Sequence, residues 1–336
     1  MPYAQAVRLG ACASLVLVAL FFSPTASVQQ KSDPLMNRAA PATSTPPTKT
    51  GDADGDDGVV VNTDLISFNV TVTDKSGQHI FGLPRSAFTV FDEKTQQEIS
   101  FFGEDDSPVS VGVVFDLTAS MTVEKVKRAR EALARFMETS HQDDEYYLIT
   151  LKNGEASLTL DRTRDSEAVT DALTGVAARG STALYDGCYL ALNKVIKGTY
   201  PRRAILLISD GRDNSSRYTF DELRRLVKES DVVIYTIGIP DEDSEHARLY
   251  GEHILEDLAE VSGGKFFQPR SRGEMYSAFE RIALELRQQY AIGYRPSNFT
   301  TDGKWRRIKV KINPPPGSPR LSVRYRSGYY AMTKQR

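Results

Sequence analysis

The chain has 336 residues, 40% of them hydrophobic, which gives room for two domains, or for one domain of about 200 residues with attachments, around a real core. The formal net charge of −2 excludes a chain that is basic throughout, but residues 291–336 hold eleven Lys or Arg against a single acid, Asp302. A basic tail of this kind suggests nucleic acid or an anionic surface as a partner.

Residues 1–27 have the pattern of an export signal. Arg8 lies in a short N-terminal region, an apolar stretch follows over residues 9–22, and small residues around Ala26 permit cleavage. The apolar stretch is too short to span comfortably a hydrocarbon core of roughly 30 Å. We therefore expect a cleaved signal and an exported protein, periplasmic, envelope-associated or secreted, with an uncleaved N-terminal anchor as the alternative. Cleavage leaves Cys188 as the only cysteine, which excludes an internal disulfide.

Residues 28–58 are rich in Pro, Thr, Ser, Asp and Gly and lack apolar periodicity, so we expect a disordered linker. The acidic run at residues 52–58 looks like a calcium loop. However, Asp57 and Thr63 stand where an EF-hand loop needs Gly and Glu, and we interpret the run as solvated.

A small N-terminal β unit follows over residues 59–106. Residues 65–72 alternate apolar and polar side chains, which is the pattern of a half-buried strand, and residues 88–91 and 98–102 form two shorter strands. The sequence of this unit shows no chemistry of its own.

Strands and helices alternate over residues 107–290. Residues 109–115 and 204–209 are nearly continuous apolar runs, as expected of parallel strands that are covered on both faces. Further strands are predicted at 146–151, 232–237 and 265–267, and helices at 122–139, 165–178, 184–196, 219–229, 246–261 and 273–288. This order predicts an α/β fold with an open, doubly wound, mostly parallel sheet.

The pattern returns to β strands over residues 291–336. Apolar and basic residues alternate over 307–312 and again over 321–326, so each strand buries one face and exposes a basic one. We therefore interpret the basic tail as a solvated strand face. We also expect these strands to pack with residues 59–106 in one small β-sandwich-like unit.

Oxygen-bearing side chains follow the predicted strands at the positions where ligands bind in such a sheet. Asp116, Thr118 and Ser120 come directly after the first core strand, Thr182 precedes a helix, and Asp210 ends another strand. Two carboxylates and three hydroxyls make an all-oxygen shell that suits Mg²⁺ or Mn²⁺. Of His and Cys, only Cys188 lies near these motifs in sequence, which argues against zinc.

These segments resemble the three metal-contacting segments of von Willebrand factor type A domains, over roughly residues 107–290. The resemblance implies a divalent cation, Mg²⁺, Mn²⁺ or Ca²⁺, near the hydroxyls of Thr118, Ser120 and Thr182, with Asp116 and Asp210 holding it directly or through water. It also implies that an acidic residue of a partner protein completes the site. Thr118 stands where Ser is commonest in the family; Thr keeps the hydroxyl and adds a methyl group.

The flanking segments 289–296, 304–310 and 326–330 resemble those of exported, mostly uncharacterised proteins of the same broad family from Acidobacteria.

A structural alternative exists for the same residues, because Asp, Ser and Thr at strand ends commonly cap helices. Thr122 or Ser120 can cap the helix that follows, and a fold of this family with a non-functional metal site remains an alternative. The nearby acids Asp186, Asp213 and Asp221 are interpreted as helix caps and turn residues.

We therefore predict an exported adhesion or scaffold module without catalytic residues, without a nucleic-acid partner, and without a membrane span after signal cleavage. The alternative is a metal-dependent phosphohydrolase. Thr118 stands where a haloacid-dehalogenase-like site needs a second Asp, and no general base is evident. The four histidines fall outside the motifs and are expected at the surface: His79, His141, His246 and His253.

Overall fold

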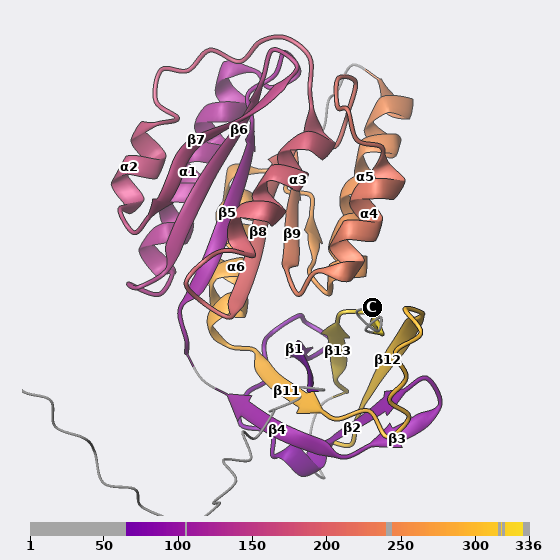
Figure 1. Cartoon of the computed structure of the whole chain (residues 1–336). Coiled ribbons are helices and arrows are strands. Elements are labelled where there is room, and N and C mark those ends of the chain that lie inside the picture. Colours follow the sequence, from indigo (N-terminus) through magenta and orange to yellow (C-terminus); the bar gives the residue numbers. More distant parts are fainter. Residues whose placement is uncertain (1–64, 105, 240–243, 315–316, 318–319, 332–336) are drawn as a thin grey trace, which may run out of the picture. The chain divides into compact units, whose positions relative to one another are not determined.

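The central feature of the computed structural model, which describes residues 65–104, 106–239, 244–314, 317 and 320–331, is a six-stranded sheet (Figure 1). Its strands lie in the order β10-β9-β8-β5-β6-β7. Neighbouring strands are parallel except β6 and β7, which pair antiparallel. The strands are β5 (Val109–Asp116), β6 (Glu145–Lys152), β7 (Glu155–Thr163), β8 (Arg202–Ser209), β9 (Val233–Gly238) and β10 (Phe266–Phe267).

Helices cover both faces of this sheet, so the predicted doubly wound α/β fold is confirmed. The helices are α1 (Val123–Thr139), α2 (Ser166–Asp171), α3 (Leu184–Val195), α4 (Phe220–Glu229), α5 (Glu245–Ser262) and α6 (Arg272–Arg287). Side chains of α1, α2 and α6 pack on one face and those of α3, α4 and α5 on the other. This separation follows from the strands, whose successive side chains point to opposite faces.

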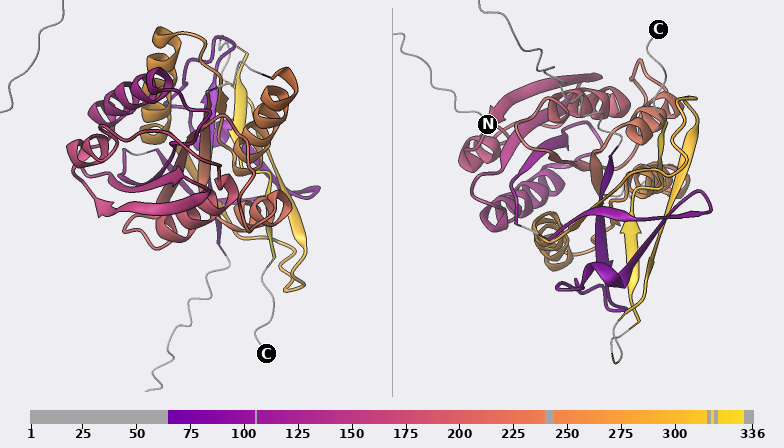
Figure 2. Two further views of the ribbon diagram at one scale, coloured as in Figure 1. Left: turned by 90° about the horizontal axis from the view of Figure 1, so that it is seen from above. Right: turned by 60° about the horizontal axis from the view of Figure 1, so that its bottom comes forward.

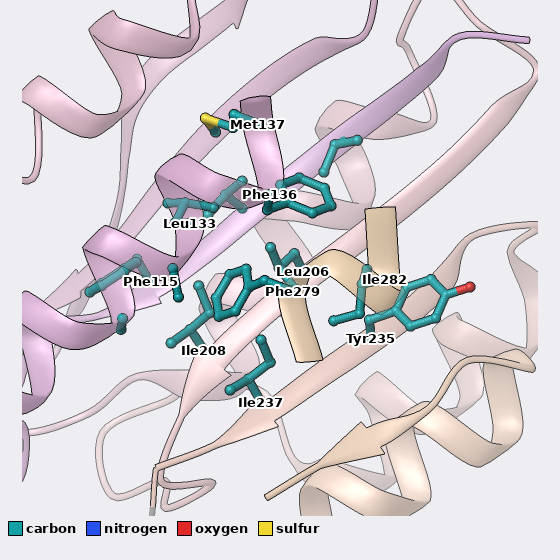
Figure 3. Close-up of a cluster of buried hydrophobic side chains, with 14 of the residues drawn as sticks. Phe115, Leu133, Phe136, Met137, Leu206, Ile208, Tyr235, Ile237, Phe279 and Ile282 are labelled. Carbon is teal, nitrogen blue, oxygen red and sulfur yellow. The ribbon is translucent and has the colours of Figure 1, made fainter. Parts of the chain in front are cut away.

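The larger of the two cores lies under α1 and α6 (Figure 3). Phe136 and Phe279 meet edge to face across it, with ring centroids 6.3 Å apart, above Phe115, Leu206 and Ile237 of the sheet. Full burial of each such side chain contributes roughly 1.5–3 kcal/mol. Packing of this kind fixes the sheet that carries the loops described below.

Strands from the two ends of the described chain pair with one another and form two further antiparallel sheets (Figure 2). Their orders are β13-β1-β11-β4 and β14-β12-β2-β3, and one shared apolar core includes Val70, Val90, Ile292 and Val310. The elements of this flanking unit are β1 (Ile66–Thr73), the short helix η1 (Arg85–Ala87), β2 (Phe88–Asp92), β3 (Thr95–Gln97), β4 (Ile99–Glu104), β11 (Tyr290–Tyr294), β12 (Trp305–Ile312), β13 (Ser322–Tyr325) and β14 (Gly328–Tyr330).

Buried polar contacts join the flanking unit to the α/β unit. Only Gln288 and Gln289 separate α6 from β11, and the Gln289 amide donates to the hydroxyl of Tyr235 in β9 over 3.0 Å. The described residues belong to one compact unit.

Two expectations about the basic strands and the histidines were wrong in part. Arg307, Lys309 and Lys311 are exposed as predicted. Arg324 instead forms an ion pair with Glu285 of α6, because β13 turns that side chain toward the α/β unit. His79, expected at the surface, also lies beside Glu285, with its Nε2 atom 3.9 Å from Oε2 and its side chain largely buried.

The region between β6 and α3 also differs from the prediction. Residues 155–163 form the edge strand β7, which was not predicted, and the helix predicted at 165–178 ends at Asp171. Gly175 has φ +70°, a left-handed conformation that ends the helical turn after α2.

The predicted signal (1–27) and linker (28–58) lie outside the described residues. Within the described ranges, no helix is both long enough and apolar enough to cross a membrane.

Candidate metal centre

Asp116 and Asp210 lie at the carboxyl edge of the sheet: Asp116 is the last residue of β5, and Asp210 directly follows β8. The chain runs from β5 to β6 on one side and later returns to β8 on the other, so this is the position where ligands bind in doubly wound sheets. We call the five predicted residues the oxygen site: Asp116, Thr118, Ser120, Thr182 and Asp210.

Asp116 is fully buried and both of its carboxylate oxygens accept hydrogen bonds. Oδ1 accepts from the backbone N of Thr118 at 3.0 Å and from its hydroxyl at 2.6 Å. Oδ2 accepts from the Ser209 hydroxyl at 2.6 Å. The carboxylate is therefore held in one orientation by groups from the loop after β5 and from the end of β8.

Thr182 joins this network from a separate loop. Its hydroxyl donates to the Thr118 hydroxyl over 2.8 Å, so an unbroken chain of oxygens runs from Thr182 through Thr118 to Asp116. Both threonines are buried. Side chains that are 64 positions apart in sequence thus bring their oxygens together at one edge of the sheet.

Backbone contacts fix the loop that carries Thr182. Ala119 N donates to the carbonyl of Gly180 at 3.0 Å, and the backbone N of Thr182 donates to Asn214 Oδ1 at 2.8 Å. Gly180 has φ +79°, and a Cβ there would collide with the backbone of Asn153. The close approach of the β6–β7 turn therefore requires glycine at this position.

Asp210 is buried, and each of its carboxylate oxygens accepts a hydrogen bond from Arg212. The backbone N of Arg212 donates to Oδ1 and its Nε donates to Oδ2, each at 3.0 Å. The next residue, Gly211, has φ +82°, and a Cβ there would overlap the Gly251 carbonyl of α5. The tight packing of this loop against α5 sets the position of Asp210.

Burial dominates the electrostatics of Asp116. It raises the pKa of Asp116 to about 6, while the hydrogen bonds from Ser209 and Thr118 act in the opposite direction and the nearby charge of Asp210 raises the pKa further. A cation bound beside Asp116 would favour the ionised form of its carboxylate.

Ser120 lies on the same loop, two residues after Thr118, and is partly buried. Its side chain makes no hydrogen bond within the described part of the chain, while its carbonyl accepts from the Lys125 ammonium at 3.3 Å. Thr122, not Ser120, caps α1 by accepting from the backbone N of Lys125. The Ser120 hydroxyl is therefore not used as a helix cap.

The oxygen site fits a hard divalent cation by the chemistry of its donors. Carboxylate and hydroxyl oxygens are what Mg²⁺, Mn²⁺ and Ca²⁺ select. Among the described residues, no cluster of three or more His, Cys, Asp or Glu could hold a metal ion. The oxygen site is of another kind, since it combines two carboxylates with three hydroxyls.

Three polar residues around the oxygen site were not singled out from the sequence: Ser209, Arg212 and Asn214. Ser209 immediately precedes Asp210 at the end of an apolar strand, and this position could have identified it from the sequence as a neighbour of the oxygen site. Asp213, expected to be a cap or turn residue, accepts from the backbone N of Leu184 at 2.8 Å and so caps α3 from a neighbouring loop.

The family model of the von Willebrand factor type A domain matches residues 110–281. No curated protein matches the chain. Three solved structures show the range of structural similarity. The chain is 14% identical to a von Willebrand factor type A protein from Catenulispora acidiphila, covering 80% of this chain and 74% of that one, with a TM-score of 0.46.

It is 17% identical to the conserved hypothetical protein BatB from Bacteroides thetaiotaomicron, covering 53% of this chain and 98% of that one, with a TM-score of 0.42. It is 15% identical to the corresponding domain of the type V pili tip protein Mfa5 from Porphyromonas gingivalis, covering 53% and 94% of the two chains, with a TM-score of 0.44.

Proposed function

The chain belongs to the von Willebrand factor type A domain family, and from this premise we propose that it is an exported protein-binding module that captures an acidic group of a partner protein through a divalent cation. The cation, Mg²⁺, Mn²⁺ or Ca²⁺, is held by the oxygen site. The protein acts as an adhesion or scaffold component and not as an enzyme.

The observation that carries the proposal is the chain of hydrogen-bonded oxygens from Thr182 through Thr118 to Asp116. These hydrogen bonds join side chains from two loops that are far apart in the sequence and meet at one edge of the sheet. When bound, the cation supplies a positive charge that lowers the cost of desolvating a partner's carboxylate.

Export is supported by the pattern of residues 1–27, and a partner would then be met outside the cytoplasm. The hydrolase alternative lacks a base at the site. Among the described residues, no hydrogen bond or ion pair joins a histidine to the oxygen site; His79 lies beside Glu285 and His141 beside Asp143.

The test is capture of a partner from the envelope fraction of the native host, with the purified mature protein as bait. We expect a partner to be retained in Mg²⁺, released by EDTA, and not retained by Asp210→Ala. The matched control is Asp161→Asn, which removes an exposed carboxylate of β7 that pairs with Lys194. Capture that is indifferent both to EDTA and to Asp210→Ala would contradict the proposal.

A further inference from the structure

A cleft of about 680 Å³ lies between the α/β unit and the flanking unit, away from the oxygen site. It is lined by residues of α4, α5, β10, β12 and β13 and of the loops next to them. The residues that matter for its chemistry are Lys228, Glu256, Glu260, Lys265, Trp305 and Arg307. Gly251, which packs against the oxygen-site loop, and Glu260 are separated by about 13 Å along α5, at 1.5 Å per residue.

Three cationic side chains that line this cleft are not held in ion pairs. Within the described residues, Lys228, Lys265 and Arg307 form no ion pair with any carboxylate, although Arg324 beside them pairs with Glu285. The two ammonium groups instead lie over aromatic rings. Lys228 Nζ is 5.3 Å from the centroid of Trp305 and Lys265 Nζ is 5.1 Å from that of Phe267. The cleft therefore presents three cationic groups that are not held in ion pairs, beside the carboxylates of Glu256 and Glu260.

Lys265 is the clearest case because it is half-buried. Burial, together with the positive charges of Arg281 and Arg324, lowers the pKa of Lys265 to about 8. Keeping a charged ammonium in this position is unfavourable for the fold unless an anion compensates it. A charged side chain that destabilises the fold and lines a cleft is common in binding sites.

The remaining groups of the cleft indicate more than a simple anion. Trp305 offers a large apolar surface and is held edge-on by Tyr330, with ring centroids 4.9 Å apart. Glu256 and Glu260 are one helical turn apart on α5, so their carboxylates project on the same side as acceptors. Neither forms an ion pair among the described residues. A ring with an apolar face, several hydroxyls and an acid group would use all of these groups together.

We propose that this cleft binds an acidic saccharide of the uronic acid class. Lys265, Lys228 and Arg307 receive its carboxylate, Glu256 and Glu260 accept hydrogen bonds from its hydroxyls, and Trp305 contacts the apolar face of a sugar ring. This site is independent of the cation and of the partner protein at the oxygen site.

The experiment uses Trp305 itself, because it is the only tryptophan in the chain and its fluorescence reports on this cleft alone. The mature protein is titrated with a galacturonic acid trisaccharide, with a neutral galactose trisaccharide and with inorganic phosphate. We expect a saturable change with the acidic trisaccharide that weakens as salt is added, and no saturation with the other two.

Variants assign the response to the cleft. Lys265→Gln and, separately, the exposed Arg307→Gln are each expected to weaken binding about tenfold, the size of a lost charge-assisted hydrogen bond. Lys127→Gln on α1 is the matched control and is expected to bind like the original protein. Asp210→Ala and EDTA are expected to leave the titration unchanged, which separates this proposal from that for the oxygen site.

The proposal would be overturned by no response to the acidic trisaccharide, by an equal response to the neutral one, or by a response that both Lys265→Gln and Arg307→Gln leave intact. Saturation by inorganic phosphate at the same concentration as the trisaccharide would show an anion site without saccharide recognition, and it would overturn the assigned class.

Discussion

The hydroxyl of Ser209 donates to Oδ2 of Asp116 over 2.6 Å, which ties the carboxyl ends of the neighbouring strands β8 and β5 together. Both residues are fully buried, so neither group can be satisfied by water. This bond holds one carboxylate of the oxygen site in place before any ligand is present.

Ser209→Ala is therefore expected to destabilise the fold by about 1–3 kcal/mol, because it leaves a buried carboxylate oxygen without its donor. It also removes an interaction that lowers the pKa of Asp116, so that pKa rises further. Urea denaturation measures the first effect. Ser181→Ala, in an exposed position one residue before Thr182, is the control and is expected to be near neutral. Equal stabilities of the two variants would contradict the role given to Ser209.

Arg212 is expected to compete with a cation for Asp210, since its Nε already lies 3.0 Å from Oδ2. Arg212→Ala should therefore bind Mg²⁺ more tightly, by up to about fivefold, the worth of a partly exposed ion pair. Calorimetric titration gives the affinity. Arg217→Ala, which removes a more exposed arginine paired with Asp186, is expected to change nothing. Weaker Mg²⁺ binding by Arg212→Ala would mean that the arginine supports the cation and does not compete with it.

Gly211→Ala is expected to destabilise the loop that carries Asp210 for two reasons, which a second variant separates. A left-handed φ of +82° costs a residue with a Cβ about 1 kcal/mol, and the Cβ would also overlap the Gly251 carbonyl. Gly175→Ala has the first cost alone, because φ there is +70° with open space around it. Thermal unfolding should show a clearly larger loss for Gly211→Ala. Similar losses for both variants would refute the close packing of the loop on α5.

Lys265 gives a pH-dependent prediction with a definite sign. Its pKa in the folded protein, about 8, lies below the ordinary 10.5, so the unfolded chain binds the proton more tightly. The contribution of this residue to stability is present above pH 10.5 and is lost as the pH falls toward 8. Lys265→Met should therefore melt at a higher temperature than the original protein at pH 7, with the difference shrinking between pH 8 and 10.5. A difference that is constant over this range would contradict the lowered pKa.

Much of the α/β unit could be predicted from the sequence because its signals are local. Continuous apolar runs gave β5 and β8, whose residues are buried on both faces, and helical stripes gave α1, α4 and α5 to within one or two residues. The edge strand β7 was missed although Ala156, Leu158 and Leu160 alternate with polar residues, the pattern of a half-buried strand. A usable signal did exist: Asn153 and Gly154 both have positive φ, as expected of the Asn-Gly turn of a hairpin.

The oxygen site could be predicted as a set of residues but not as a network. Strand-end position places Asp116 and Asp210 at one sheet edge, yet nothing in the sequence states that Thr182 donates to Thr118. The same holds for the basic tail. The alternation of apolar and basic residues predicted that Arg324 lies on a solvent-exposed strand face. Whether that face is exposed depends on what packs against it. Here the α/β unit packs against it and places Glu285 beside Arg324.

The most direct test of the central claim is calorimetric titration of the purified mature protein with Mg²⁺ and with Mn²⁺, beside Asp210→Ala and the surface control Asp161→Asn. Circular dichroism of all three proteins establishes that they are equally folded. The account predicts one cation per chain for the original protein and for Asp161→Asn, and none for Asp210→Ala. A cation affinity that is the same in the original protein and in a folded Asp210→Ala, or no binding of either cation by the original protein, would contradict it.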